Sequence, residues 1–233
     1  MFRDREDAGR QLAEALRQRS WRDPVVLAIP RGGLVIGAAL ARILPAELDV
    51  VLSRKLPAPS QPELAIGAVS EDGEVILNRL LVERLEIDPD YITRETSRQL
   101  AEIRRRQSLY RQVRPAAKLT GRSVIVTDDG IATGSTMIAA LHAARWQRPA
   151  QLVVAVPVGS PDRLQEVGRH CDEVICLLAP EDFWAVGQFY EYFPQLADEE
   201  AMAILAEAWR QYCDRTRGRP TSETGEQHEP GSS

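Results

Sequence analysis

Residues 124–136 read VIVTDDGIATGST, and this stretch decides the fold. It begins with four apolar or β-branched residues, which is the pattern of a buried parallel strand. The adjacent carboxylates of Asp128 and Asp129 follow at the carboxyl end of that strand. Gly134 and three hydroxyl residues come next, and residues 137–145 have the apolar spacing of a helix. The order strand, acidic pair, short loop and helix is typical of a unit that holds an anion at a helix N-terminus.

The loop 132–136 offers the groups that bind phosphate. The first N–H groups of a helix lack partners, and the positive end of the helix dipole faces the same way. Gly134 allows the backbone a close approach, and Thr133, Ser135 and Thr136 add hydroxyl donors. The acidic pair cannot also hold phosphate, so we expect it to bind hydroxyl groups or a metal-bound ligand, both of which suit a sugar phosphate. An ordinary turn with capping Ser and Thr would leave the two carboxylates unexplained.

A second strand, turn and helix unit occurs near the start of the chain. Residues 25–29 are apolar, and Arg31, Gly32 and Gly33 separate them from a helical pattern over 34–43. The glycines expose bare amides, and the guanidinium can pair with an anion in a forked geometry. Alone, this turn could equally be a simple connection with a solvent-facing Arg. Beside the first unit, we interpret it as the other half of an anion clamp.

A basic pair follows the next predicted strand, 48–53. Arg54 and Lys55 leave a strand whose carboxyl end lies at the same sheet edge as the acidic pair, where open parallel sheets bind ligands. We therefore expect phosphate contacts from them, the alternative being a solvated basic pair. Three prolines within 57–62 predict a loop. Further strands are expected at 64–69, 75–77, 152–156 and 173–178, and further helices at 7–18, 78–86, 89–113 and 201–212, with another beginning at 161.

The stretch 94–122 is strongly basic, with nine basic residues against two acidic ones. We favour a solvated helix face with some ion pairs. The alternative is that part of this stretch reaches an anionic substrate or an acidic partner.

Residues 182–193 hold six of the thirteen aromatic residues of the chain. Such a segment could stack a planar base, with Phe183 and Trp184 as contacts, or it could be a hydrophobic plug or a dimer contact. The sequence leaves both alternatives open.

The stretch 124–136 resembles the phosphoribosyl pyrophosphate (PRPP) signature of type I phosphoribosyltransferases, and residues 31–33 resemble their pyrophosphate loop. The resemblance covers about residues 23–178. It implies a Rossmann-like α/β fold, in which a parallel sheet is flanked by helices and carries a small hood. It also implies transfer of ribose 5-phosphate from PRPP to a nucleobase-like or other nitrogen acceptor, with release of pyrophosphate.

The resemblance assigns roles to individual residues. Asp128 and Asp129 would hold the ribose hydroxyls and Mg²⁺, which is bound mainly through PRPP. The loop that starts at Ala132 would hold the 5-phosphate, and the loop at Arg31 the pyrophosphate. We expect these two carboxylates, Arg31 and Lys55 to be the catalytic residues. Such pyrophosphate loops often contain an unusual peptide conformation, here at Pro30 or Arg31, and a mobile loop is expected within the basic stretch.

One position departs from part of the family. Hypoxanthine-guanine enzymes carry an Asp where this chain has Ala132, whereas adenine-type enzymes have Ala. The resemblance therefore makes a 6-oxopurine acceptor less expected, and it leaves the residue that handles the acceptor proton unassigned. A non-catalytic PRPP-binding regulator of the same fold is the alternative function.

Length and composition fit one domain and exclude several classes. The chain has 233 residues, of which 44% are hydrophobic, and a net charge of −5, which argues against general nucleic-acid binding. We expect a domain over 1–213, with a helical insertion at 78–114, a hood and closing helix at 180–213 and a disordered tail at 214–233. The three cysteines and the lack of a signal or membrane-spanning pattern predict a cytoplasmic protein. A dinucleotide-binding domain is excluded because no G-x-G-x-x-G motif follows the first strand.

Overall fold

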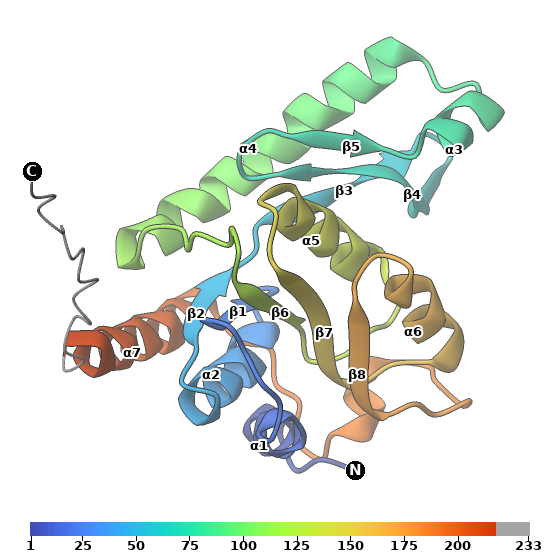
Figure 1. Cartoon of the computed structure of the whole chain (residues 1–233). Coiled ribbons are helices and arrows are strands. Elements are labelled where there is room, and N and C mark those ends of the chain that lie inside the picture. The colour runs from blue at the N-terminus through green and yellow to red at the C-terminus, as the bar shows by residue number, and fades with distance from the viewer. Residues whose placement is uncertain (218–233) are drawn as a thin grey trace, which may run out of the picture.

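A five-stranded parallel sheet forms the centre of the computed structural model, which describes residues 1–217. Its strand order is β2-β1-β6-β7-β8, and every neighbouring pair is parallel. The strands are β1 (Val25–Ala28), β2 (Glu47–Val50), β6 (Ser123–Thr127), β7 (Gln151–Val158) and β8 (Glu173–Leu178). All residues of β1 and β6 are buried, as the continuous apolar runs predict for strands covered on both faces. The predicted α/β class is confirmed (Figure 1).

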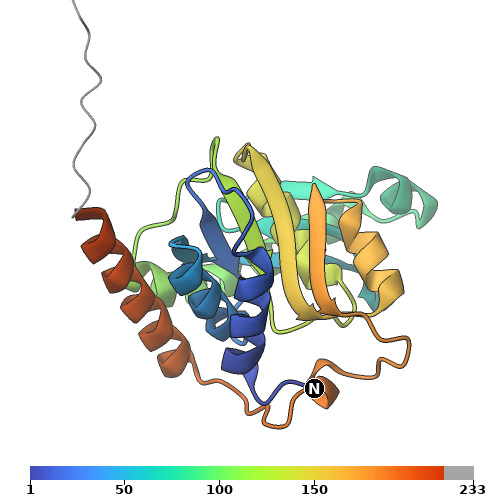
Figure 2. The ribbon, with the colours of Figure 1, turned by 60° about the horizontal axis from the view of Figure 1, so that its bottom comes forward.

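Helices cover both faces of this sheet. One face packs against α1 (Arg5–Leu16), α2 (Gly33–Ile43) and α7 (Asp198–Arg217), which Figure 2 shows gathered on one side. The other face packs against α5 (Ser135–Trp146) and α6 (Pro161–Gly168). The two faces bury separate hydrophobic clusters, because side chains alternate across each strand.

A small antiparallel sheet and two helices form the insertion between β2 and β6. The strands are β3 (Ser53–Ala58), β4 (Gln61–Ser70) and β5 (Val75–Leu77), and the helices are α3 (Arg79–Arg84) and α4 (Pro89–Val113). Figure 1 shows α4 lying along this sheet.

The loop predicted at 57–62 is wrong, because β3 and β4 form a hairpin that turns at Pro59 and Ser60. Pro57 fits within β3 because the pairing register shifts there, and a bulge tolerates a residue without an N–H donor. The predicted strand 48–53 is also divided, since β2 ends at Val50 and β3 begins at Ser53.

Buried ion pairs fix the end of α4 to the central sheet. The Arg111 guanidinium donates to Asp49 and to Glu71, each at 2.7 Å. Arg114 has a side chain only 1% exposed and donates to the Glu47 carboxylate. The expected ion pairs of the basic stretch are thus confirmed at these positions, although the Arg114 pair is buried and the Arg111 pairs are partly buried.

The last helix is longer than predicted. A helix was expected over 201–212, whereas α7 runs from Asp198 to Arg217, so residues 214–217 of the expected tail are helical. Residues 218–233 of that expected tail lie outside the described residues. Within residues 1–217, no helix combines the length and the apolar character needed to cross a membrane.

Candidate functional site

The two predicted anion loops lie against each other at the carboxyl edge of the sheet. They follow β1 and β6, which are neighbours, with Ala28 paired to Thr127. A Cβ atom on Gly32 would lie 2.0 Å from Asp129 Oδ2, and one on Gly33 would lie 3.0 Å from the Cα of Asp128. Only glycine fits at such a distance, so the missing side chains are what allow the two loops to touch. The peptide bond between Pro30 and Arg31 is cis, at the position where the resemblance implied an unusual peptide.

The N-terminus of α5 lies beside this contact. Gly134 precedes the helix with φ of 80°, a left-handed conformation that glycine adopts without strain. No side chain forms a capping hydrogen bond at this position. An ordinary capped turn is therefore not what the structure contains. The N–H groups of the first turn are left for an anion.

The acidic pair is electrostatically strained. Asp128 lies deep among packed atoms while keeping some solvent contact, and this burial raises its pKa well above the usual range. The adjacent Asp129 raises the pKa of Asp128 further, while a backbone hydrogen bond from Asp129 N to Asp128 Oδ1, at 2.8 Å, lowers it. Two neighbouring carboxylates in one site resist ionising together, so a cation or hydroxyl donors would be favoured there.

Arg5 contacts the acidic pair, and sequence reasoning missed it. Its Nε atom donates to Asp129 Oδ2 at 2.8 Å, and its guanidinium lies 3.7 Å from the centre of the Phe193 ring. Its Nη1 atom donates to the carbonyl of Pro194 at 2.7 Å, and its side chain is only 11% exposed. No local signal marks this residue in the charged N-terminal stretch, since its partners are distant in sequence.

The aromatic segment forms a hood over this pair. The Tyr190 hydroxyl donates to the carbonyl of Asp129 at 2.6 Å, and burial strongly raises the pKa of Tyr190. Its ring packs on Phe2 and on Phe193. The hood is thus a packed aromatic cluster joined to the N-terminal residues.

The two aromatic residues expected to contact the acceptor lie elsewhere in the hood. Phe183 packs on Phe189, with ring centres 5.3 Å apart, and Trp184 is 91% exposed. Their role in acceptor binding stays a prediction.

A cationic cavity of about 360 Å³ adjoins the two loops. It is lined by Pro30 of the first loop, by Thr136 of the second and by four basic side chains. These are Arg54, Lys55, Arg98 and Arg106. The first two were predicted, whereas the last two come from α4, so part of the basic stretch does face a potential anion site.

Hydrogen bonds and charges shape this cavity. Arg54 Nε donates to Gln99 Oε1 at 2.8 Å, and burial followed by the nearby charge of Arg106 lowers the pKa of Arg54. Arg31 is further out, where its guanidinium lies 3.6 Å from Asp198 and is 43% exposed. Of the basic residues predicted to contact phosphate, Arg54 and Lys55 therefore line the cationic cavity, whereas Arg31 lies on an exposed loop.

The acidic pair provides the oxygen ligands that Mg²⁺ prefers, which makes it suitable for this cation. In residues 1–217, no group of three or more His, Cys, Asp or Glu side chains could hold a metal ion. A magnesium ion at Asp128 and Asp129 would need its remaining oxygens from a bound ligand and from water.

Comparisons with known proteins agree with this geometry. Residues 3–194 match the family described as the phosphoribosyl transferase domain, and the chain therefore belongs to the phosphoribosyltransferase family. Two Mycobacterium tuberculosis proteins, provisionally named phosphoribosyl transferases, are 44% identical over 214 residues. That match covers 92% of this chain and 48% of each relative, so the chain spans about half the length of these curated relatives.

Further relatives are similar in sequence or structure. A ribose-phosphate pyrophosphokinase from Sulfurisphaera tokodaii is 38% identical over 80 residues, covering 34% of this chain and 25% of that enzyme. The crystal structure of TT1426 from Thermus thermophilus is 47% identical, with a TM-score of 0.84. It matches over 88% of this chain and 98% of its own, so the fold and the order of its elements are shared.

Proposed function

We propose that this protein transfers ribose 5-phosphate from PRPP to a nitrogen acceptor and releases pyrophosphate, with Mg²⁺ as cofactor. The contact between Gly32 and Asp129 Oδ2 is the observation that carries the proposal. It joins a loop of bare amides to an acidic pair, beside an uncapped helix N-terminus and a cationic cavity. A sugar that bears a phosphate at one end and a pyrophosphate at the other presents matching groups in the same order.

Each part of the site has a role in this proposal. The N–H groups and hydroxyls of the loop 132–136 hold the 5-phosphate, and Asp128 accepts from the ribose hydroxyls. The amides of Gly32 and Gly33, together with Arg54 and the other cations of the cavity, hold the pyrophosphate. Magnesium, when bound, neutralises charge on the pyrophosphate oxygens.

The chemical step exchanges two bonds at the ribose C1 atom. The bond to the pyrophosphate oxygen breaks and a bond to the acceptor nitrogen forms, through a transition state with positive charge on the sugar ring. In this proposal the carboxylates of Asp128 and Asp129 stabilise that charge, while the hood around Tyr190 excludes water. The rate enhancement then comes from positioning and electrostatics, without a covalent enzyme intermediate.

A PRPP-binding regulator is the second candidate, and one observation favours it. The side chains of Arg94, Arg104 and Arg105 are exposed on α4, so a basic helix face is available to nucleic acid. The net charge of −5 opposes this function.

The test measures PRPP binding by calorimetry with and without Mg²⁺, followed by a screen of nucleobases for pyrophosphate release. We expect binding that is lost in the Asp128→Asn, Asp129→Asn double variant. A folded wild-type protein that does not bind PRPP would contradict both candidates. Binding without turnover on any base, together with salt-sensitive binding of nucleic acid, would favour the regulator.

A further inference from the structure

A cavity of about 640 Å³ lies at the amino edge of the sheet, away from the reaction site. Asp23 and Pro24, which lead into β1, line it, as does Pro45, which precedes β2. The acidic pair follows the carboxyl end of β6, so the length of the parallel strands separates the two places. This volume lies within the range of small-ligand pockets.

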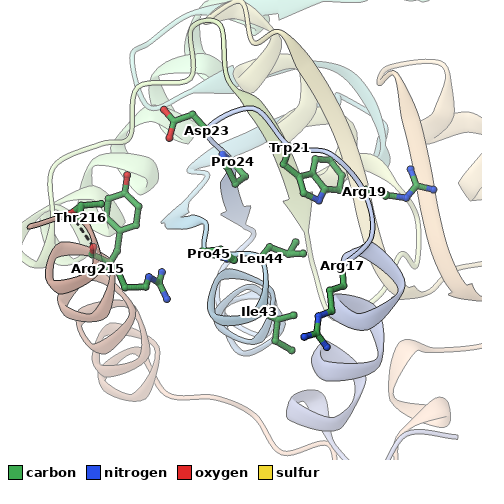
Figure 3. A pocket seen from close by; sticks show the side chains of 11 residues that line it. Arg17, Arg19, Trp21, Asp23, Pro24, Ile43, Leu44, Pro45, Arg215 and Thr216 are labelled. Atoms are coloured by element: carbon green, nitrogen blue, oxygen red, sulfur yellow. Dashed lines mark hydrogen bonds between the residues drawn. The ribbon is translucent and has the colours of Figure 1, made fainter. Parts of the chain in front are cut away.

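Cationic and aromatic side chains line this cavity from opposite sides. Figure 3 shows Arg17 and Trp21 on one side, Arg215 on the other, and Leu44 with Pro45 between them. The ring of Tyr212 adds a second aromatic wall.

Asp23 is the only acidic side chain among residues 1–217 that lines the cavity, and it already forms an ion pair. Its carboxylate lies 2.8 Å from Arg122 Nε. Arg19 also lines the cavity but is paired with Glu173 at 2.5 Å. The least committed charges are therefore Arg17, whose contact with Glu14 is exposed and 3.4 Å long, and Arg215.

These two guanidiniums have donors to spare. Arg215 uses Nη2 for the carbonyls of Ala41 and Ala46, at 3.4 and 3.2 Å, and within the described part of the chain its Nε and Nη1 have no hydrogen-bond partner. Arg17 has a single long contact, 3.4 Å to Glu14, and is 65% exposed. Free N–H donors on guanidiniums from two different helices suit an anion with several oxygens.

Carbonyl oxygens at the helix C-termini beside the cavity accept hydrogen bonds from within the protein. Helices α1 and α2 both end here, and carbonyls at helix C-termini would repel an anion. However, Leu16 O accepts from Trp21 Nε1 at 3.3 Å, and Ala41 O accepts from Ala46 N at 3.1 Å. These hydrogen bonds weaken the repulsion that the C-terminal carbonyls of both helices would exert on an anion.

Three helices connect this cavity with the reaction site. Helix α1 begins at Arg5, which contacts Asp129, and ends next to Arg17. Helix α2 begins at Gly33, and the cavity residues Ile43 and Leu44 lie at its end.

The third connection is α7. It begins at Asp198, which lies 3.6 Å from Arg31, and carries Tyr212 and Arg215 near its end. A shift of any of these helices along its axis would change contacts at both ends together.

We propose that the amino-edge cavity binds a nucleotide-like anion, with its planar ring against Trp21 and its phosphate between Arg17 and Arg215. Ring stacking and charge-assisted guanidinium hydrogen bonds are the interactions that such a ligand uses. Occupancy changes the affinity of the reaction site for PRPP through α1, α2 and α7, and this second part rests on the proposed function. By linkage, PRPP must then change the affinity for the nucleotide by the same factor.

The binding test uses the indole N–H signals in NMR spectra of the full chain, assigned by Trp→Phe variants. AMP, GMP and UMP are titrated separately, with inorganic phosphate as the ring-free probe. We expect a saturable shift of the Trp21 signal with a nucleotide, while Trp146, which is outside the cavity, serves as reference. The Arg17→Gln, Arg215→Gln double variant should weaken this binding by about tenfold or more, whereas the Arg10→Gln, Arg210→Gln variant, which changes the same helices, should not.

Several outcomes would overturn the binding site. They are no shift of Trp21 with any nucleotide, an equal shift with inorganic phosphate alone, or equal affinity in both double variants. Circular dichroism and thermal melting establish that each variant is folded. Nucleotide binding at the reaction site can be told apart, because the Arg17→Gln, Arg215→Gln variant should leave its affinity unchanged.

The coupling test measures PRPP affinity with Mg²⁺ in the presence and absence of the saturating nucleotide. We expect a change of about fivefold or more in the wild type and none in the Arg17→Gln, Arg215→Gln variant. Unchanged affinity in the wild type would overturn the regulatory part. A wild type that binds nucleotide at Trp21 but no PRPP would instead contradict the proposed function, and the binding site would stand.

Discussion

Arg5 Nε lies 2.8 Å from Asp129 Oδ2, so the first residue of α1 forms an ion pair with the second carboxylate of the acidic pair across 124 positions of sequence. This ion pair gives the two carboxylates different electrostatic environments. Asp129 is neutralised by a cation and held under the hood, whereas the pKa of Asp128 is raised by burial. The same guanidinium contacts Phe193 and Pro194, so Arg5 also joins the hood to the site.

Replacing Arg5 by Met should raise the pKa of Asp128 further. The guanidinium favours the ionised carboxyl, and without it the burial of Asp128 and the charge of Asp129 are less opposed. The carbon-13 NMR titration of the Asp128 carboxyl in the ligand-free protein should move to higher pH, and PRPP binding at neutral pH should weaken. Arg10→Met, on the same helix but outside the site, is the control. An unchanged titration would show that Arg5 has no electrostatic role.

Asp128→Asn should stabilise the ligand-free protein at neutral pH and weaken PRPP binding. The unfolded chain ionises this carboxyl near its ordinary pKa, whereas the folded chain keeps the proton to a higher pH. The folded form thus binds more protons between these two pKa values, and its stability falls as the pH rises through that window. The amide removes this cost, so the Tm of the ligand-free variant at neutral pH should lie above that of the wild type. The gain should vanish below the ordinary pKa of Asp, and a gain that persists there would contradict the charge argument.

Gly32→Ala should lower PRPP affinity by about tenfold or more, equivalent to about 1.4 kcal/mol. The new methyl group would lie 2.0 Å from Asp129 Oδ2, so the Asp129 side chain, which Arg5 holds, or the loop itself must shift. Gly168→Ala is a matched control, because its Cβ would meet only an ordinary contact of 3.6 Å with Val174. Calorimetry with PRPP and Mg²⁺ compares the two variants. Equal affinities would mean that the loops need not touch.

Arg106→Gln should weaken pyrophosphate binding by about tenfold, whereas Arg105→Gln should not. Both side chains pair with Glu102 on α4, but only Arg106 lines the cationic cavity. Each contact to a charged phosphate oxygen is worth about 1.5–3 kcal/mol. Titrations with pyrophosphate and with ribose 5-phosphate separate the two ends of the donor. If the variant lost affinity only for ribose 5-phosphate, the cavity could not be the pyrophosphate site.

Arg114→Met should destabilise the protein by about 3 kcal/mol, because it leaves a buried Glu47 carboxylate with one partner fewer. The exposed pair of Arg163 and Glu166 provides the comparison, since Arg163→Met should change stability by less than about 0.5 kcal/mol. Urea unfolding measures both differences. Similar values for the two variants would mean that the Arg114 pair does not hold the insertion to the core.

Much of the candidate site could be predicted from local patterns. The strand, carboxylate, loop and helix order of 124–136 is contiguous, and so is the turn at 31–33. A parallel sheet places the carboxyl ends of its strands at one edge, so two such units had to lie at the same edge. The basic pair Arg54 and Lys55 was predicted by the same rule, and both residues line the cationic cavity.

Other features depend on contacts between distant segments. The turn region 57–62 was predicted as a loop because its prolines disfavour strands, and only the bulged pairing across β3 and β4 accommodates them. Arg98 and Arg106 could not be distinguished from their solvated neighbours, because the sequence does not specify which side of α4 faces the cavity.

The sequence by itself therefore determined the sheet, the two anion loops and the family that they indicate, because each rests on residues close together in the chain. Only the tertiary structure decided that Arg5 neutralises Asp129, that Tyr190 covers it and that Arg17 and Arg215 line one cavity at the opposite edge. Such contacts join residues distant in the chain, more than a hundred positions apart for Arg5 and Asp129. Their geometry is set by the packing of whole helices on the sheet, which no local pattern encodes.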